Sequence, residues 1–378
     1  MSNRPSRRLF AAVLTGLLLV AVPALAAFAE RWSVELDKGV AGGLAADGMG
    51  RVFATVQKNS GSLLHAFDAD GSALWEVKRK DTLAGVAMSA DESSVIVAGH
   101  AKSGKIVVEA FDPATGDSQG VTSFNPANNY KARDGAFVSV SDKTGVVYVA
   151  APIRKSGVCC AYMIGQLDAD GTLQWNHRTG SADGATATVA SIGADPKGKG
   201  VFVSGSALVD GVDTPFMARY AADGSEKWRT FRDPTSTAAG ITVSNNGKKI
   251  FLFNKKPGAN FFEVGLFNNK GKSKWLRPLL LTGSAGSRGS IQLSDNGKLL
   301  YMVASVLDNS FAEHGFMMRT DTKTSGPMIV RTESEDATLS SWFRHVALDS
   351  NGEPVVFEQR FNVETGAQLP PNVIAYDE

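Results

Sequence analysis

The sequence has few cysteines, no excess charge of either sign and no long hydrophobic run beyond its first 29 residues. Its two cysteines, Cys159 and Cys160, are adjacent and cannot join distant segments, so stability must come from a hydrophobic core. The formal net charge is +1, which gives no electrostatic reason to bind nucleic acid or an anionic membrane surface. Hydrophobic residues make up 43% of the chain and charged residues 20%, as expected for a folded globular protein.

The first 29 residues have the composition of a secretory signal peptide. Three arginines form a basic start, residues 9–22 are apolar, and either Ala24-Leu25-Ala26 or Ala27-Phe28-Ala29 supplies the small residues of a cleavage site. We predict that residues 1–29 are a signal peptide and that residues 30–378 form one secreted or periplasmic domain. This mature chain carries 36 Lys and Arg against 38 Asp and Glu.

Two alternatives for this segment stay open. The first is an uncleaved anchor helix, which Pro23 and a run shorter than the roughly 20 apolar residues of a membrane span argue against. The second concerns the export route, because SRRLF at residues 6–10 resembles a twin-arginine motif, whereas the strongly apolar run favours ordinary secretion. We expect no membrane span after cleavage.

A short hairpin pattern recurs along the chain. It consists of an apolar residue, a polar turn ending in Gly, and a Trp four residues after that Gly. Its clearest copies are FDADGSALW from Phe67, LDADGTLQW from Leu167, YAADGSEKW from Tyr220 and FNNKGKSKW from Phe267. Asp, Asn and Gly favour such tight turns because they tolerate positive φ.

A second pattern, an Asp- or Asn-rich turn followed by an apolar run, occurs seven times. Its copies align within a residue on positions 44–54 residues apart, namely Asp47, Asp91, Asp142, Asp195, Asn245, Asp295 and Asp349. This period is typical of propeller blades, and continuously apolar runs fit strands covered on both faces. We predict an all-β fold, a single β-propeller of seven four-stranded blades. Six or eight blades are alternatives, since the second, sixth and seventh units lack the full hairpin pattern.

The two ends of the mature chain are predicted to share one blade. Residues 372–378, NVIAYDE, match the third strand of a unit. The missing fourth strand appears at the other end, where Trp32, Val34 and Leu36 alternate on one face. The N-terminal strand therefore completes the C-terminal blade, which leaves no open sheet edge.

The hairpins LDADGTLQW and FDADGSALW, with the degenerate FDPATGDSQ from Phe111, resemble the repeats of the quinoprotein-type propeller superfamily. The resemblance covers the mature chain and implies a propeller fold, but no single function, because enzymes and assembly factors share this structural turn. Quinoprotein alcohol dehydrogenases set a ring of two adjacent, disulfide-bonded cysteines against their cofactor, so the resemblance makes Cys159 and Cys160 a candidate platform for it. Other cofactor-binding residues do not match, so pyrroloquinoline quinone with calcium is a secondary alternative and the cofactor is unknown.

Ligands of propellers usually bind at the mouth of the axial channel, which is formed by the loops between successive blades and between the second and third strands. Cations recur in the loops that enter the second to seventh blades, at Lys80, Arg133, Arg178, Arg232, Arg288 and Arg344. A converging ring of cations would suit a carboxylate, sulfate or phosphate, whereas the acidic residues among them indicate solvated charge. The preferred ligand-binding candidates are Arg133, Arg288 and Arg344.

Cysteine and histidine residues give further mouth-side candidates. Cys159 and Cys160 fall between the second and third strands of the third blade, as a strained vicinal disulfide or as two small residues that begin a strand. His100, His314 and His345 come from three different units, and no two have metal-ligand spacing, so no metal site is predicted. The DADG carboxylates lack the rest of a calcium loop and are assigned to turn formation.

No nucleophile with a base, and no metal-ligand set, is recognisable in the sequence. GDSQG from Gly116 matches G-x-S-x-G but has no helix after it. We therefore favour an exported binding or scaffold propeller that holds a protein or small ligand through its mouth loops. The alternatives are a quinone-dependent dehydrogenase and a hydrolase-type propeller enzyme, and the sequence does not identify the ligand or partner.

Overall fold

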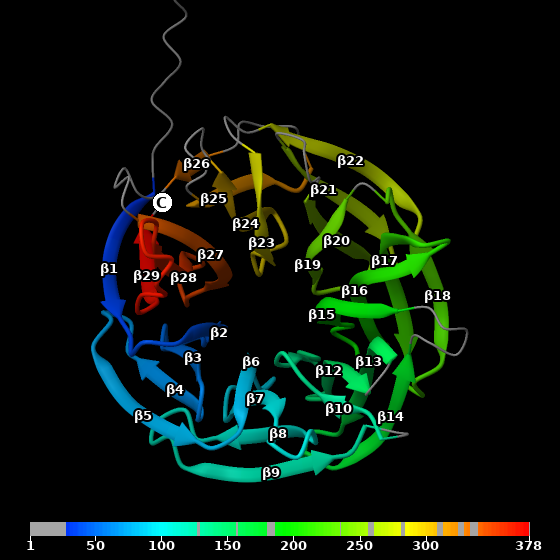
Figure 1. Cartoon of the computed structure of the whole chain (residues 1–378), viewed down its shortest axis with the longest axis horizontal. Coiled ribbons are helices and arrows are strands. Elements are labelled where there is room, and N and C mark those ends of the chain that lie inside the picture. Colours follow the sequence, from blue (N-terminus) through cyan, green and yellow to red (C-terminus); the bar gives the residue numbers. More distant parts are fainter. Residues whose placement is uncertain are drawn as a thin grey trace, which may run out of the picture.

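The computed structural model describes residues 28–126, 129–155, 158–179, 186–234, 236–255, 261–280, 284–307, 313–323, 329–332 and 339–377. This part of the chain contains strands and no helix. Viewed down its axis, it forms seven antiparallel sheets arranged in a ring (Figure 1). The prediction of an all-β propeller with seven blades is confirmed.

Each blade runs outward from the ring centre in chain order. Blade 1 is formed by β2 (Val40–Ala46), β3 (Val52–Lys58), β4 (Gly61–Phe67) and β5 (Ala73–Arg79). Blade 2 is formed by β6 (Thr82–Met88), β7 (Val95–His100), β8 (Ile106–Phe111) and β9 (Ser118–Phe124). Blade 3 has five strands, β10 (Lys131–Ala132), β11 (Phe137–Val140), β12 (Val147–Lys155), β13 (Val158–Leu167) and β14 (Leu173–Thr179), because β10 and β11 both pair with β12.

The other four blades have four strands each. Blade 4 is formed by β15 (Ala187–Ala194), β16 (Gly200–Val209), β17 (Val212–Ala221) and β18 (Glu226–Phe231). Blade 5 is formed by β19 (Thr237–Val243), β20 (Lys249–Lys255), β21 (Phe261–Asn268) and β22 (Ser273–Leu280). Blade 6 is formed by β23 (Ser284–Leu293), β24 (Leu299–Leu307), β25 (Glu313–Asp321) and β26 (Ile329–Thr332). Blade 7 is formed by β27 (Leu339–Leu348), β28 (Pro354–Asn362), β29 (Asn372–Asp377) and β1 (Ala29–Glu35).

Blade 7 closes the ring by joining the two ends of the described chain. Strand β1 is its outermost strand and pairs antiparallel with β29, with Trp32 opposite Ala375 and Val34 opposite Val373. Arg31 adds an ion pair to Asp349, with Nη2 and Oδ2 2.6 Å apart. The predicted closure is therefore confirmed, and no open sheet edge separates the first blade from the last.

The predicted boundary between leader and domain at residue 30 stays a prediction, and the two residues before it are described by the structure. Phe28 is 2% exposed and belongs to a hydrophobic cluster with Tyr301 and Tyr376. Ala29 already pairs with Asp377 as the first residue of β1. Phe28 is thus packed in the core, and Ala29 is paired in β1 with its side chain exposed.

The second strand of each blade lies between neighbouring blades and is buried on both faces. In β12, Val147, Tyr148 and Val149 are each at most 2% exposed, although their side chains point to alternate faces. Val147 packs in one cluster with residues of blade 2, and Tyr148 packs in another with residues of blade 4. Continuous apolar runs in the sequence therefore mark strands that are covered from both sides.

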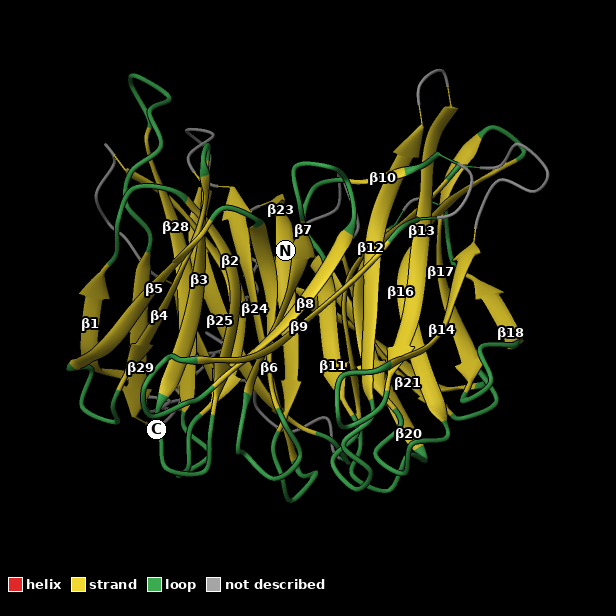
Figure 2. Cartoon of the chain, turned by 90° about the horizontal axis from the view of Figure 1, so that it is seen from below, coloured by secondary structure: helices red, strands yellow, loops and turns green. Residues whose placement is uncertain are grey.

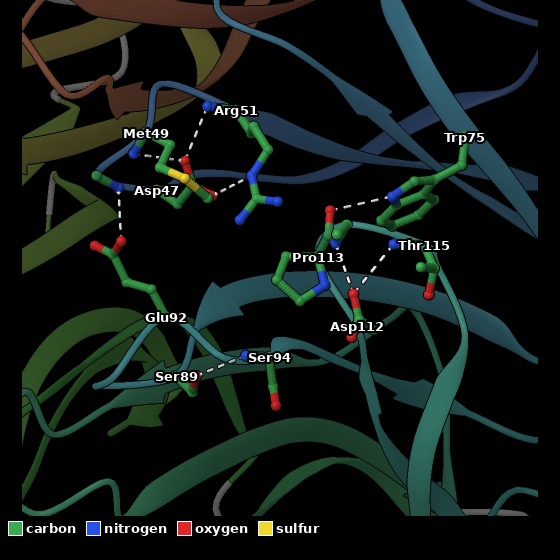
Figure 3. A network of polar contacts seen from close by, with 12 residues as sticks. Asp47, Met49, Arg51, Trp75, Ser89, Glu92, Ser94, Asp112, Pro113 and Thr115 are labelled. Carbon is green, nitrogen blue, oxygen red and sulfur yellow. Dashed lines mark hydrogen bonds and ion pairs between the residues drawn. The ribbon is translucent and has the colours of Figure 1, made fainter.

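Aspartates in the tight turns accept backbone amides, as the turn interpretation predicted. Asp47 Oδ1 accepts hydrogen bonds from the amides of Met49 at 3.0 Å and Arg51 at 2.9 Å (Figure 3). Asp68 and Asp168 do the same in the DADG hairpins, each taking the amide four residues on at 2.8 Å. These carboxylates therefore hold the turns in shape.

Tryptophans on the outermost strands of four blades fasten each of these blades to the turn of the next one. The indole Nε1 of Trp75 in β5 donates to the carbonyl of Pro113 in blade 2 at 3.1 Å (Figure 3). The equivalent bonds are Trp32 to Ala69 at 3.0 Å, Trp175 to Ala222 at 2.7 Å and Trp228 to Asn269 at 3.1 Å. Turn residue Gly71 has φ +86° and lies so close to the Trp32 ring that a Cβ would come within 2.7 Å of it.

Truncating one of these tryptophans should weaken the ring measurably. We expect Trp75→Ala to lower the free energy of unfolding by about 3 kcal/mol, because it removes a partly buried indole and its hydrogen bond. The neighbouring Leu74 is 43% exposed, and Leu74→Ala should change stability by less than about 0.5 kcal/mol. Urea unfolding of both variants measures the difference, and equal midpoints would contradict the fastening role.

Candidate functional site

The mouth face of the propeller, defined here by the hairpins between second and third strands and by the connections between blades, is the irregular side of the ring. In Figure 2 the β16–β17 hairpin, β10 and the upper ends of β12 and β13 lie toward this edge, and the short Asp-containing turns lie at the opposite edge. The sequence varies in length on the mouth side and repeats on the turn side. Functional variation is therefore concentrated at the mouth.

A small axial cavity lies where the innermost strands converge. Its volume is about 120 Å³, and its lining residues include Gly43 on β2, Gly85 on β6, Ser191 on β15, Ser290 on β23 and His345 on β27. Pockets that bind cofactors or other small molecules usually measure about 300–1,000 Å³. A quinone cofactor does not fit this cavity, whose size suits a few water molecules.

Two of the predicted site residues come together beside blade 2. His100 ends β7 and is partly buried, whereas Arg133 is exposed in the connection between β10 and β11. Burial, reinforced by the positive charge of Arg133, lowers the pKa of His100 below its ordinary value of 6.5. Its imidazole is therefore neutral at neutral pH. The nearby carboxylate of Asp134 is engaged by Arg154 at 2.8 Å.

Three other predicted residues lie within strands of blades 6 and 7. Arg344 and His345 are in the middle of β27, so Arg344 was wrongly placed in a loop, and only His345 is found on the axial cavity. His314 is the second residue of β25 and lies opposite Val306. A common ligand for these residues remains a prediction.

The remaining predicted residues are placed by their backbone alone. Arg288 lies within β23 and not in a loop, which corrects the prediction, and its side chain is outside the described part of the structure. Cys159 and Cys160 are the second and third residues of β13. They were expected in the preceding loop, and the alternative that they begin a strand is correct for the backbone. The vicinal disulfide concerns side chains outside the described set and stays a prediction.

Several of the recurring cations serve contacts between structural elements. Arg232 stacks over the Phe267 ring of blade 5 at 5.0 Å and pairs with Glu263 of the same blade at 3.5 Å. Arg178 stacks over Tyr130 at 5.0 Å. These two guanidinium groups therefore fasten neighbouring elements and are not part of a ring around the axis.

A buried polar network in blades 3 and 4 was missed by the sequence analysis. The hydroxyl groups of Tyr162 and Tyr220 lie 2.8 Å apart, and Arg229 Nη2 donates to Tyr220 at 3.1 Å, to Thr179 at 2.9 Å and to Glu226 at 2.7 Å. Burial raises the pKa of Tyr162 well above its usual value, so this phenol stays protonated. The shared hydrogen bonds make the network a brace between the two blades. Its members lie on four different strands, and no motif in the sequence connects them.

Three exposed apolar side chains lie toward the mouth-side end of blade 4, and the strand register places Val212 and Phe231 on one face and Leu208 on the other. Leu208 and Val212 flank the tip of the β16–β17 hairpin and are 39% and 50% exposed, while Phe231 at the end of β18 is 46% exposed. Their exposure makes the mouth-side end of blade 4 a candidate surface for binding another protein. Among the described residues, no three His, Cys, Asp or Glu side chains gather closely enough to hold a metal ion.

A family model described as outer membrane protein assembly factor BamB matches residues 18–208, which is half of the 378-residue chain. The chain belongs to this family. The BamB match covers blades 1 to 3 and the first two strands of blade 4, and it confirms the resemblance to quinoprotein-type repeats. No curated protein matches the sequence.

Solved structures with similar folds confirm the architecture. The chain is similar to hydrazine synthase of Kuenenia stuttgartiensis, with 14% identity, a TM-score of 0.60, and coverage of 90% of this chain and 97% of that one. It is similar to a chain of a mitotic checkpoint complex, with 12% identity, a TM-score of 0.58, and coverage of 100% and 99%. The Dos1 propeller gives 14% identity, a TM-score of 0.55, and coverage of 90% and 78%. At these identities the likeness concerns the fold alone. No helix able to cross a membrane is found among the described residues.

Proposed function

We propose that this protein is an exported scaffold that binds a partner protein through its mouth face and takes part in the assembly of outer membrane proteins. The observation that carries the proposal is the match of residues 18–208 to the BamB family, whose description names that assembly role. The exposed apolar side chains of Val212 and Phe231, on one face of blade 4, supply apolar area suited to a protein partner. The rigid ring serves to hold this surface in place.

The proposal places the protein in the periplasm, and the N-terminal segment would direct export. Of the two candidate cleavage sites, the one after Ala26 leaves Phe28 in the mature chain, whereas the one after Ala29 removes it. Phe28 is buried against blades 6 and 7, and Ala29 is part of β1. We infer that the signal peptide is cut after Ala26, because the later cut would remove a packed core residue.

The mass of the exported chain tests this inference. Expression of the full sequence in a bacterium with an outer membrane should yield a periplasmic protein that begins at Ala27. A chain engineered to begin at Glu30 should unfold at a lower temperature than one that begins at Ala27, because it lacks the buried Phe28 side chain. An exported chain with the mass expected for a start at Glu30, or an uncut chain, would contradict the inference.

Photo-crosslinking in living cells tests the binding surface. A photoreactive phenylalanine analogue at Val212 should give a defined adduct with an outer membrane protein or a component of its assembly machinery. The control is the same analogue at Met49, which is 63% exposed on the turn side of the ring. Equal adducts at the two positions, or none at Val212, Leu208 and Phe231, would reject the mouth face as the binding surface.

A further inference from the structure

The contact between blades 2 and 3 differs from the indole contacts that the outer strands of blades 1, 3, 4 and 7 make with the turn of the next blade. In β5 the residue opposite Ala66 is Trp75, and in β9 the residue at the same register, opposite Ala110, is Gly120. Gly120 also lies four residues after turn residue Gly116, which is the spacing of the tryptophans in the other hairpins. A Cβ built on Gly120 would find no atom within 4 Å. Blade 2 therefore lacks the indole that would seat on blade 3.

The side chain that would pack against the missing indole is also smaller than its counterparts in blades 1, 3 and 4. Trp75, Trp175 and Trp228 each pack against an aromatic ring near the start of the second strand of their own blade, and these rings belong to Phe53, Tyr148 and Phe202. In blade 2 the second residue of the corresponding strand, β7, is Ile96. The loss of both ring systems enlarges the space between the blades.

A cavity of about 510 Å³ occupies this position, and we name it the blade 2–3 groove. Its apolar walls are Ile96 and Val108 of blade 2 and Val147 and Leu167 of blade 3, each at most 7% exposed. Its rim is polar and includes Ser94, Gln119, Asp91 and Asp170. An apolar floor with a polar rim is the composition of a binding pocket.

The groove also retains the hydrogen-bond acceptor that an indole uses elsewhere in the ring. Tryptophans 32, 175 and 228 donate to the carbonyl two residues before the turn glycine of the next blade. In blade 3 that carbonyl belongs to Ala169, which lines the groove, and within the described part of the chain it is paired with no donor. The turn itself has the usual geometry, since the Gly171 amide donates to Asp168 at 3.0 Å, as the Gly71 amide does to Asp68 at 3.1 Å.

We propose that the blade 2–3 groove binds the tryptophan side chain of a partner protein, whose indole N–H would donate to the Ala169 carbonyl. The four indole contacts elsewhere in the ring show that this arrangement of strands and turn accepts an indole. The polar groups of the rim, Ser94 and Gln119 among them, can hydrogen-bond the backbone on either side of a bound tryptophan, which favours an indole within a polypeptide. This site lies outside the mouth face and does not depend on the function proposed above.

Titration with N-acetyl-L-tryptophanamide, followed by ligand-observed NMR, tests the proposal. The protein should bind this probe saturably with a Kd on the order of 1 mM, as expected for one aromatic side chain without further contacts. N-acetyl-L-phenylalaninamide should bind about fivefold more weakly, because it cannot donate to the carbonyl. Absence of saturable binding of the tryptophan probe would overturn the proposal. Tighter binding of free tryptophan than of its amide would overturn the assignment to a partner protein.

A variant whose own side chain fills the groove tests whether the probe binds there. Gly120→Trp should weaken probe binding at least tenfold and raise the unfolding midpoint, because the new indole takes the place of the ligand. Val363→Trp adds the same side chain at a position between β28 and β29 that is 43% exposed, and it should leave probe binding unchanged. If Gly120→Trp does not fold, Gly120→Leu fills part of the same space and should also weaken binding. Unchanged binding in a folded Gly120 variant would place the probe elsewhere and refute the proposal.

Discussion

The contact on which this structure depends is the indole of an outer strand seated on the turn of the next blade. It combines burial of a large ring, a hydrogen bond from the indole N–H, and a glycine that leaves room for the ring face. Because the first of these contacts comes from Trp32 on β1, the strand that completes blade 7 also fastens blade 7 to blade 1. Ring closure and blade packing therefore rest on the same interaction.

Because the blades are packed in this way, we expect the functional sites on the surface of the ring. The axial cavity formed by the described residues measures about 120 Å³, which is smaller than the sites that usually hold a cofactor. The turn side is occupied by aspartates that hold backbone amides, and the outer flank carries the tryptophans. What varies is the mouth face, where Leu208 and Val212 are exposed, and the junction of blades 2 and 3, where Gly120 stands at the position of a tryptophan. Departures from the repeat are thus the best guide to function.

The repeat could be predicted from sequence because its determinants are local. The turn residues, the buried runs and the pairing of Trp32 with Ala375 follow from short patterns that return about every 50 residues. The mouth could not be predicted in the same way, because its connections have no period. Arg288 and Arg344 accordingly lie in strands where loops were expected, and the Tyr162–Tyr220–Arg229 network joins strands that no motif connects. The glycine at position 120 was visible in the degenerate hairpin, but its cavity depends on Ile96 and on the walls of blade 3.

Hydrogen–deuterium exchange of Trp32→Ala against the unchanged protein tests the central claim most directly. The indole of Trp32 contacts the turn at residues 68–72, whose backbone hydrogen bonds join Asp68 to Ser72 and Gly71 to Asp68. The account predicts faster exchange both in β1 and β29 and in this turn, which belongs to another blade and lies about 40 residues away in sequence. Faster exchange confined to β1, with the turn unchanged, would show that the indole does not fasten the two blades and would contradict the account.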